Sequence, residues 1–298
     1  MAEKTILHML TPHKHVSPFD VNMAADAGFD VIVPYENVTL EEVGDLVQDA
    51  IFSRPPDRGA ATGIFFGGDD AVLALDMIEA GKSALVPPFG CHLFADPAGS
   101  FTTAAAMVAC VEKRLKTATG RDLSGLRIAV FGATGVVGYS SAVIAALEGA
   151  EVTLVGYSGL KRVEDRAAEI AARFGVRVKA ADGSTAEKNT EIIRGSDAVF
   201  AAAKAGVRVL DAAQIAAAPD LLIAADVNAV PPSGIEGIDP FDDAKPIGDT
   251  RALGIGALAI GNVKYQTEAG LFRRMIEAKE PLTLDFRDAF ALARTLVP

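Results

Sequence analysis

The segment 128–138 constrains this chain most, because in it an apolar strand runs into a glycine turn and then into a helix. Its glycines follow the spacing GxxGxxG, at positions 132, 135 and 138. The first permits a tight turn, the second lets the backbone approach a diphosphate, and the third lets the helix pack on the sheet. A helix N-terminus attracts anions, so the segment predicts a dinucleotide-binding turn, with a plain strand-to-helix turn as the alternative. The expected cofactor contacts are Gly132, Thr134, Gly135, Val136, Val137 and Gly138.

Predicted strands and helices alternate along the sequence from the strand before this turn onward. Strands are predicted at Leu126–Phe131, Val152–Val155, Val176–Ala181, Ala198–Ala203 and Leu221–Val227. Strands that are apolar on both faces belong in a parallel sheet covered by helices on both sides. Residues 119–264 are therefore predicted to form a Rossmann-type dinucleotide-binding domain.

The first 118 residues are predicted to form a smaller N-terminal α/β domain that binds the substrate. Strands are expected at Thr5–Leu10, Asp30–Pro34, Gly63–Phe66 and near Ala84–Val86, with helices at Pro18–Ala27, from a Thr39/Glu42 capping box to Phe52, through Met77, and from Thr102 to Leu115. Residues 116–126 are polar and glycine-bearing, as expected of a linker. Helices at about Asn262–Ala278 and after Asp285 are expected to return to the first domain. The fold class is thus a two-domain α/β protein.

Composition excludes several kinds of function. The net charge of −11 opposes a phosphate backbone, so nucleic acid is not expected as a partner. No apolar run approaches the roughly 20 residues of a membrane helix, and the first residues lack the features of a signal peptide, so we expect a cytoplasmic protein with no membrane partner. Only two cysteines are present, and no Cys/His spacing suits a metal, so neither a disulfide nor a metal site is predicted.

The end of the second Rossmann strand bears on the choice of nucleotide. NAD-specific sites place a carboxylate there to bind the ribose 2′-hydroxyl, and none occurs between Gly156 and Arg162. A 2′-phosphate could instead be accepted by Ser158, Lys161 and Arg162, beside Tyr157. This favours NADP without excluding NAD. The alternative for the two cations is an ordinary solvated helix start.

The ends of the later strands are also candidates, because ligands of open α/β sheets bind at the carboxyl ends of strands. Ala203 and Lys204 end one strand, and the small side chains there leave room for a nicotinamide ring. Asp226 and Asn228 end another, and either orient a ligand or cap the following Pro231-Pro232 turn.

Several longer strings are more specific than the glycine turn. They are His8–Pro12, Ser17–Met23, Ala95–Thr103, Asp226–Pro232 and Gly254–Gln266. In these strings the chain closely resembles, nearly end to end, the NAD(P)-dependent methylene-tetrahydromethanopterin dehydrogenases of methylotrophic bacteria.

The resemblance implies oxidation of a methylene-tetrahydropterin to its methenyl form, with NADP or NAD as hydride acceptor, as one step of formaldehyde oxidation to formate. It implies a pterin site in the cleft between the domains, and it favours a catalytic role for Lys264. A cofactor contact at Gly256 and self-association into a homo-oligomer are also expected. For Lys264 a solvated helix face is the alternative reading.

Other residues of the matching strings are candidates for the substrate site. Asp20, as a catalytic residue, and Asp96 are expected to contact the pterin, with a helix cap and an Asx turn as their respective alternatives. Phe19 is expected to stack on the ring, or to be core. Ser100, Thr102 and Thr103 either donate hydrogen bonds to the substrate or cap the helix they open. The four histidines, His8, His13, His15 and His92, are taken as structural or peripheral.

Three other functions stay open at this point. The first is a dehydrogenase of the same two-domain build that acts on methylene-tetrahydrofolate. The second is one that acts on a small hydroxy or amino acid, although the acid/base pair and arginine that such enzymes commonly use are not evident in the sequence. The third is a non-catalytic NADP-binding sensor, because a fold does not fix a function.

Overall fold

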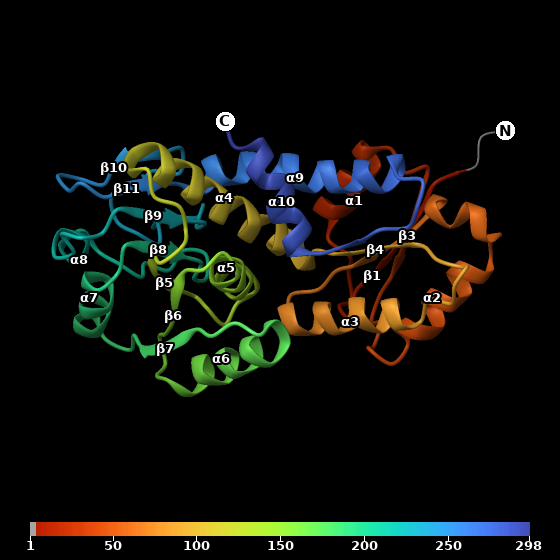
Figure 1. Ribbon diagram of the computed structural model, residues 1–298, viewed down its shortest axis with the longest axis horizontal. Helices are drawn as coiled ribbons and strands as arrows, with labels where there is room; N and C mark the ends of the chain where they lie inside the picture. Colours follow the sequence, from red (N-terminus) through yellow and green to blue (C-terminus); the bar gives the residue numbers. More distant parts are fainter. Residues whose placement is uncertain (1–3) are drawn as a thin grey trace. The chain divides into compact units, whose positions relative to one another are not determined.

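The computed structural model describes residues 4–298, which divide into two compact units (Figure 1). One unit holds the residues up to Thr102 together with Tyr265–Leu292, and the other holds Thr103–Lys264 with Ala293–Pro298. The chain passes between the units inside helices α4 (Ser100–Thr119), α9 (Ala257–Glu277) and α10 (Phe286–Leu296). From the sequence the first boundary is expected later, at residue 118, because the polar residues after α4 resemble a linker.

The first unit is built on a five-stranded parallel sheet in the order β12-β4-β3-β1-β2. Its strands are β1 (Ile6–Leu10), β2 (Val31–Tyr35), β3 (Thr62–Phe66), β4 (His92–Ala95) and β12 (Thr283–Leu284). Its helices are α1 (Pro18–Ala27), α2 (Val43–Phe52), α3 (Ala71–Ser83) and most of α10 (Phe286–Leu296), with short 3-10 turns at Pro56–Ala61 and Pro97–Gly99. Figure 1 shows α2 and α3 on one face of this sheet and α1 and α9 on the other.

An aromatic cluster fills the space between this sheet and α9. The ring of Phe272, on α9, lies 5.7 Å from Phe65 on β3 and 5.2 Å from Phe94 on β4, measured between centroids. Phe29 meets the same ring edge to face at 6.1 Å. Such pairs contribute about 0.5–1.5 kcal/mol beyond the burial of their area, so they fix α9 against the sheet.

The expected strand near Ala84–Val86 is wrong. The amide of Ala84 donates to the carbonyls of Ala80 and Gly81, which extends the end of α3, and the cis Pro87-Pro88 bond follows. The fourth strand comes later, at His92–Ala95. A buried histidine is tolerated there because its Nδ1 accepts from the amide of Leu282 and its Nε2 donates to the carbonyl of Ala60, both at 2.9 Å.

The second unit contains a seven-stranded sheet in the order β10-β11-β9-β8-β5-β6-β7. Six strands are parallel, namely β5 (Arg127–Phe131), β6 (Glu151–Gly156), β7 (Lys179–Asp182), β8 (Ala198–Ala201), β9 (Ile223–Asp226) and β11 (Leu253–Ile255), and β10 (Asp243–Pro246) is antiparallel. The five strands expected here, and the α/β class, are confirmed. Helices α5 (Val136–Leu147), α6 (Lys161–Phe174), α7 (Ala186–Arg194) and α8 (Ala212–Ala216) connect the strands.

Strand order reverses between β5 and its neighbours β6 and β8, which leaves a crevice at the carboxyl ends of these strands. Within residues 4–298, no helix has both the length and the apolarity that a bilayer crossing requires.

Candidate functional site

The glycine turn after β5 has the close approaches that the sequence predicted. Gly132 has φ of +74°, and a Cβ atom there would lie 2.2 Å from the carbonyl oxygen of Ala202. A Cβ on Gly138 would lie 2.4 Å from the carbonyl oxygen of Gly132. Gly135 caps α5 in an extended conformation, and no side chain caps this helix. Its first amides are therefore available to an anion, so the turn fits a dinucleotide diphosphate.

A cavity of about 350 Å³ opens beside this turn, at the ends of β5, β6 and β8. Its lining consists of Gly132, Ala133, Thr134, Gly135, Val155, Gly156, Tyr157, Ser158, Arg162, Val163, Ala202, Ala203 and Lys204. Eight of the predicted cofactor contacts are brought together here: Gly132, Thr134, Gly135, Tyr157, Ser158, Arg162, Ala203 and Lys204. Val136, Val137 and Gly138 follow in the first turn of α5.

Four other predicted cofactor residues, Lys161, Asp226, Asn228 and Gly256, lie outside this lining. Lys161 forms an ion pair with Asp165 one helical turn later, which raises the pKa of the lysine, and its side chain is largely exposed. A Cβ on Gly256 would lie 2.0 Å from the carbonyl oxygen of Asp239, so this glycine serves close packing of two backbone segments.

Asp226 and Asn228 hold together the loop that follows β9. The carboxylate of Asp226 accepts from the amides of Asn228 and Ile235, both at 3.0 Å, and burial raises its pKa. The amide oxygen of Asn228 accepts from the amide of Gly206 at 3.1 Å, and its nitrogen donates to the carbonyl of Pro232 at 2.8 Å. Of the two alternatives left open by the sequence, this geometry favours a turn-stabilising role over direct cofactor contact.

The first unit has its own cavity, of about 270 Å³, at the carboxyl ends of β1 and β3. Its lining consists of Thr11, His13, His15, Val16, Ser17, Asp20, Gly67, Gly68, Asp69 and Ala98. Asp20 lies in the first turn of α1, where the hydroxyl of Ser17 is the cap, and it is buried. Of the predicted substrate residues, Asp20 alone lines this cavity.

Two of the histidines expected to be structural or peripheral, His13 and His15, line this cavity. The Nε2 atom of His13 lies 2.8 Å from the carboxylate of Asp69, and the Nδ1 atom of His15 lies 3.7 Å from the carboxylate of Glu36. The sequence shows only that His13 follows β1 and Asp69 follows β3; that the two strands are adjacent and parallel is seen in the structure. Residues just past the ends of neighbouring parallel strands meet at one edge of the sheet.

The remaining predicted substrate residues are placed differently. Asp96 and Thr102 are fully buried and bonded to each other, with 2.6 Å between carboxylate and hydroxyl, and Asp96 also accepts from the amide of Phe101. This arrangement favours helix capping over a substrate contact. Ser100 and Thr103 are partly buried at the start of α4, Phe19 is 46% exposed on α1, and Lys264 is partly buried on α9.

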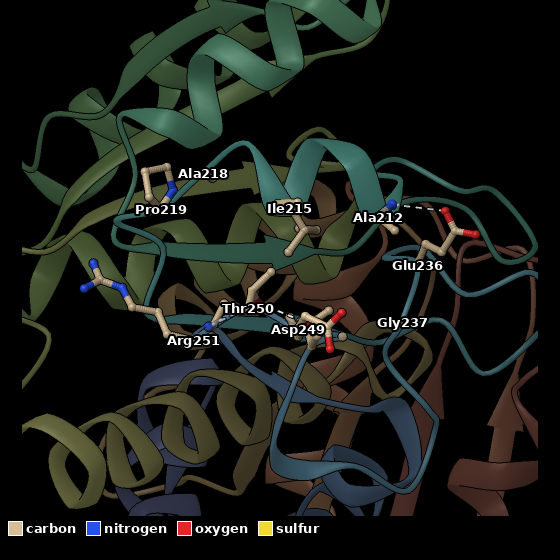
Figure 2. A pocket seen from close by; sticks show the side chains of 13 residues that line it. Ala212, Ile215, Ala218, Pro219, Glu236, Gly237, Asp249, Thr250 and Arg251 are labelled. Atoms are coloured by element: carbon tan, nitrogen blue, oxygen red, sulfur yellow. Dashed lines mark hydrogen bonds between the residues drawn. The ribbon is translucent and has the colours of Figure 1, made fainter.

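A larger cavity, of about 640 Å³, lies elsewhere in the second unit (Figure 2). Its wall includes Ala218 and Pro219, which precede β9, and Arg251 and Ala252, which directly precede β11. At its rim the amide of Ala212 donates to Glu236 (Figure 2). The amino ends of parallel strands are not where such sheets bind cofactors, so size does not make this cavity the site. Among the described residues, no group of three or more His, Cys, Asp or Glu side chains is placed to hold a metal ion.

Residues 18–98 match the family described as "Methylene-tetrahydromethanopterin dehydrogenase, N-terminal". Two solved structures share the fold, at identities too low to indicate more. These are shikimate 5-dehydrogenase from Listeria monocytogenes (TM-score 0.51, 16% identity, 98% of this chain and 96% of that one) and ornithine carbamoyltransferase from Pyrococcus furiosus (TM-score 0.53, 12% identity, 93% and 86%).

Two curated proteins of Methylorubrum extorquens are similar over nearly their whole length. The "Bifunctional protein MdtA" is 36% identical over 293 residues, which cover 98% of this chain and 99% of that one. The "NAD(P)-dependent methylenetetrahydromethanopterin dehydrogenase" is 56% identical over 290 residues, or 97% of this chain and 98% of that one. The chain therefore belongs to the family of NAD(P)-dependent methylenetetrahydromethanopterin dehydrogenases.

Proposed function

We propose that this protein oxidises methylene-tetrahydromethanopterin to the methenyl form and transfers the hydride to NADP or NAD. The observation that carries the proposal is the 56% identity, along nearly the whole of both chains, to a relative named for that reaction. The cavity beside the glycine turn adds independent support, because it lies at the carboxyl ends of β5, β6 and β8 and next to the uncapped start of α5, where dinucleotides bind in such folds. We extend the proposal to a place in formaldehyde oxidation.

The residues of the second unit would hold the cofactor. The uncapped amides at the start of α5 would bind its diphosphate, and the segment Gly156–Ser158 after β6 would receive the adenosine ribose. The bound nicotinamide supplies the hydride acceptor. Ala202 and Ala203, at the end of β8, leave room beside the turn.

Residues of the first unit would hold the pterin in the cavity at the carboxyl ends of β1 and β3. Loss of a hydride leaves a cation on the substrate and requires no proton transfer, so an obligatory general base is not needed. The carboxylate of Asp20, buried at this cavity, would stabilise the developing cation. Most of the rate would come from holding donor and acceptor together, which contributes up to about 7–11 kcal/mol in favourable systems.

Four further residues are proposed for the substrate on the family resemblance. Phe19 has an exposed ring on α1 that would stack on the pterin, and Ser100 and Thr103 would donate hydrogen bonds from the start of α4. Lys264 would orient the substrate from α9. Their role is tested by the effect of each substitution on the KM for the pterin with the KM for NADP as internal control.

We also propose a cytoplasmic location and a homo-oligomeric state. Cys91 and Cys110 are both free and buried, as is usual for proteins of reducing compartments. The oligomeric state is tested by sedimentation velocity of the purified protein. A single species of monomer mass at micromolar concentration would contradict self-association.

The activity is tested by following the absorbance of reduced nicotinamide with purified protein, methylene-tetrahydromethanopterin and either NADP or NAD. Methylene-tetrahydrofolate is assayed in parallel. Rapid reduction with the methanopterin substrate is expected. Nucleotide binding without reduction by either pterin would contradict the proposal and favour the sensor reading.

A further inference from the structure

Two cationic side chains line the nucleotide cavity without any partner. Arg162 and Lys204 both belong to its lining. Within residues 4–298, no ion pair or hydrogen bond engages either charged group. The lining contains no carboxylate, so both positive charges are available to an anionic ligand.

The two cations lie on opposite sides of β5, because the sheet order is β8-β5-β6. Lys204 follows Ala202, whose carbonyl oxygen is in close approach to Gly132, so this lysine lies on the side of the glycine turn. Arg162 lies in the first turn of α6, just after the end of β6. In folds of this type the diphosphate binds at the glycine turn and the adenosine ribose binds at the end of the second strand.

Two other charged groups near β6 already have partners. Lys161 pairs with Asp165 and does not line the cavity. Asp182, which pairs with Gly156 in the sheet register, is a carboxylate at the end of the neighbouring strand. It accepts from the ammonium of Lys188 at 2.5 Å and from the amide of Ser184 at 2.9 Å, and these bonds lower its pKa to about 2. It is thus engaged away from a ribose 2′-hydroxyl.

The position of Arg162 is suited to binding an anion. A cation in the first turn of a helix opposes the helix dipole; Glu164 supplies a carboxylate in the same turn and Lys161 pairs with Asp165, whereas within residues 4–298 no ion pair engages Arg162. A phosphate placed there would meet both the guanidinium and the positive end of α6. An arginine fork can also bind two phosphate oxygens at once.

We infer that Arg162, assisted by the hydroxyl of Ser158, binds the 2′-phosphate of NADP, whereas Lys204 serves the diphosphate that NADP and NAD share. The inference rests on the proposed dinucleotide function. It also explains how one site takes both nucleotides: no carboxylate of the lining repels the 2′-phosphate, and only Arg162 and Ser158 distinguish the two ligands.

The test is calorimetric titration of the purified protein with NADP and with NAD, for the wild type, Arg162→Ala, Arg162→Lys, Lys161→Ala and Lys204→Ala. Arg162→Ala is expected to weaken NADP binding by about 10- to 100-fold, as expected for loss of a charged hydrogen bond, and to leave NAD binding within about threefold. Arg162→Lys should fall between the two. Lys161→Ala, the matched control one residue away, should change neither affinity, and Lys204→Ala should weaken both nucleotides alike.

The possible outcomes distinguish a failure of this inference from a failure of the proposed function. If Arg162→Ala weakens both nucleotides equally, or weakens neither while the wild type binds both, the inference is overturned and the dinucleotide site stands. If the wild type binds neither nucleotide, the proposed function fails as well.

Discussion

The glycine turn offers a matched pair of substitutions that separates folding from cofactor binding. Gly132→Ala places a side chain at φ of +74° with its Cβ 2.2 Å from the carbonyl oxygen of Ala202, the residue that follows β8. The left-handed conformation costs about 1–2 kcal/mol and relieving the overlap about 1–3 kcal/mol, so we expect a loss of about 2–5 kcal/mol in the free energy of unfolding. For a unit of this size each kcal/mol corresponds to a shift in Tm of about 2–4 °C.

Gly135→Ala is the contrasting change. Gly135 has φ of −83°, and the nearest atom to its Cβ would be the carbonyl oxygen of Gly132 at 3.4 Å, so an alanine fits the fold. Its methyl group would instead occupy the approach of the diphosphate. We expect Tm to stay within about 2 °C and the affinity for both NADP and NAD to fall at least about tenfold, equivalent to about 1.4 kcal/mol.

The assays are thermal unfolding by circular dichroism and calorimetric titration with each nucleotide. An unchanged affinity of Gly135→Ala would refute the placement of the diphosphate. An unchanged Tm of Gly132→Ala would refute the close approach of β5 to β8.

Three further predictions follow from other parts of the chain. Asp20→Asn should lower kcat by about 10- to 100-fold with little change in the KM for NADP, if its charge stabilises the developing cation; a KM effect alone would assign it to binding. The carboxylate of Asp197 accepts from the side chain and amide of Arg127, at 2.9–3.0 Å, and these bonds lower its pKa. A carboxyl group whose pKa is lowered by folding stabilises the protein at pH values above its unfolded pKa, near 4, and this stabilisation is lost as the pH falls through the folded pKa. In urea titrations the free energy of unfolding of Asp197→Asn should therefore be about 1–2 kcal/mol below that of the wild type at pH 7, with a smaller difference at about pH 3. An equal difference at both pH values would contradict the ion pair. Burial raises the pKa of Cys91 and Cys110 to about 12, so neither thiol should react with a maleimide at neutral pH until the protein is unfolded, and prompt labelling of the native protein would show that one is accessible.

Much of the fold was predictable because its signals are local. The strands β5, β6 and β8 are apolar runs, and the turn after β5 needs glycine for reasons that involve only its neighbours in the sheet. The two-residue strand β12 carries no such signal. It exists because the backbone of Leu282 and Leu93 pairs across 189 positions of sequence, at 2.8 Å.

The candidate site residues were predictable where their position depends on nearby residues of the sequence, and not where it depends on how distant segments pack. The nucleotide cavity collects eight predicted residues because they follow three adjacent strands. For Asp96 and Thr102 the sequence leaves two roles open, a substrate contact or the capping of a turn or helix, and only their mutual hydrogen bond favours capping. His13 and Asp69 were missed because their contact depends on the order of the strands.

The most direct test of the proposed reaction is isotopic. Methylene-tetrahydromethanopterin carrying two deuterium atoms on the methylene carbon is oxidised by the purified protein with NADP, and the reduced nucleotide is analysed by mass spectrometry and proton NMR. Direct transfer predicts one deuterium per reduced nucleotide, bound at nicotinamide C4. Formation of unlabelled reduced nucleotide, or no reduction at all while the nucleotide binds, would contradict the proposal.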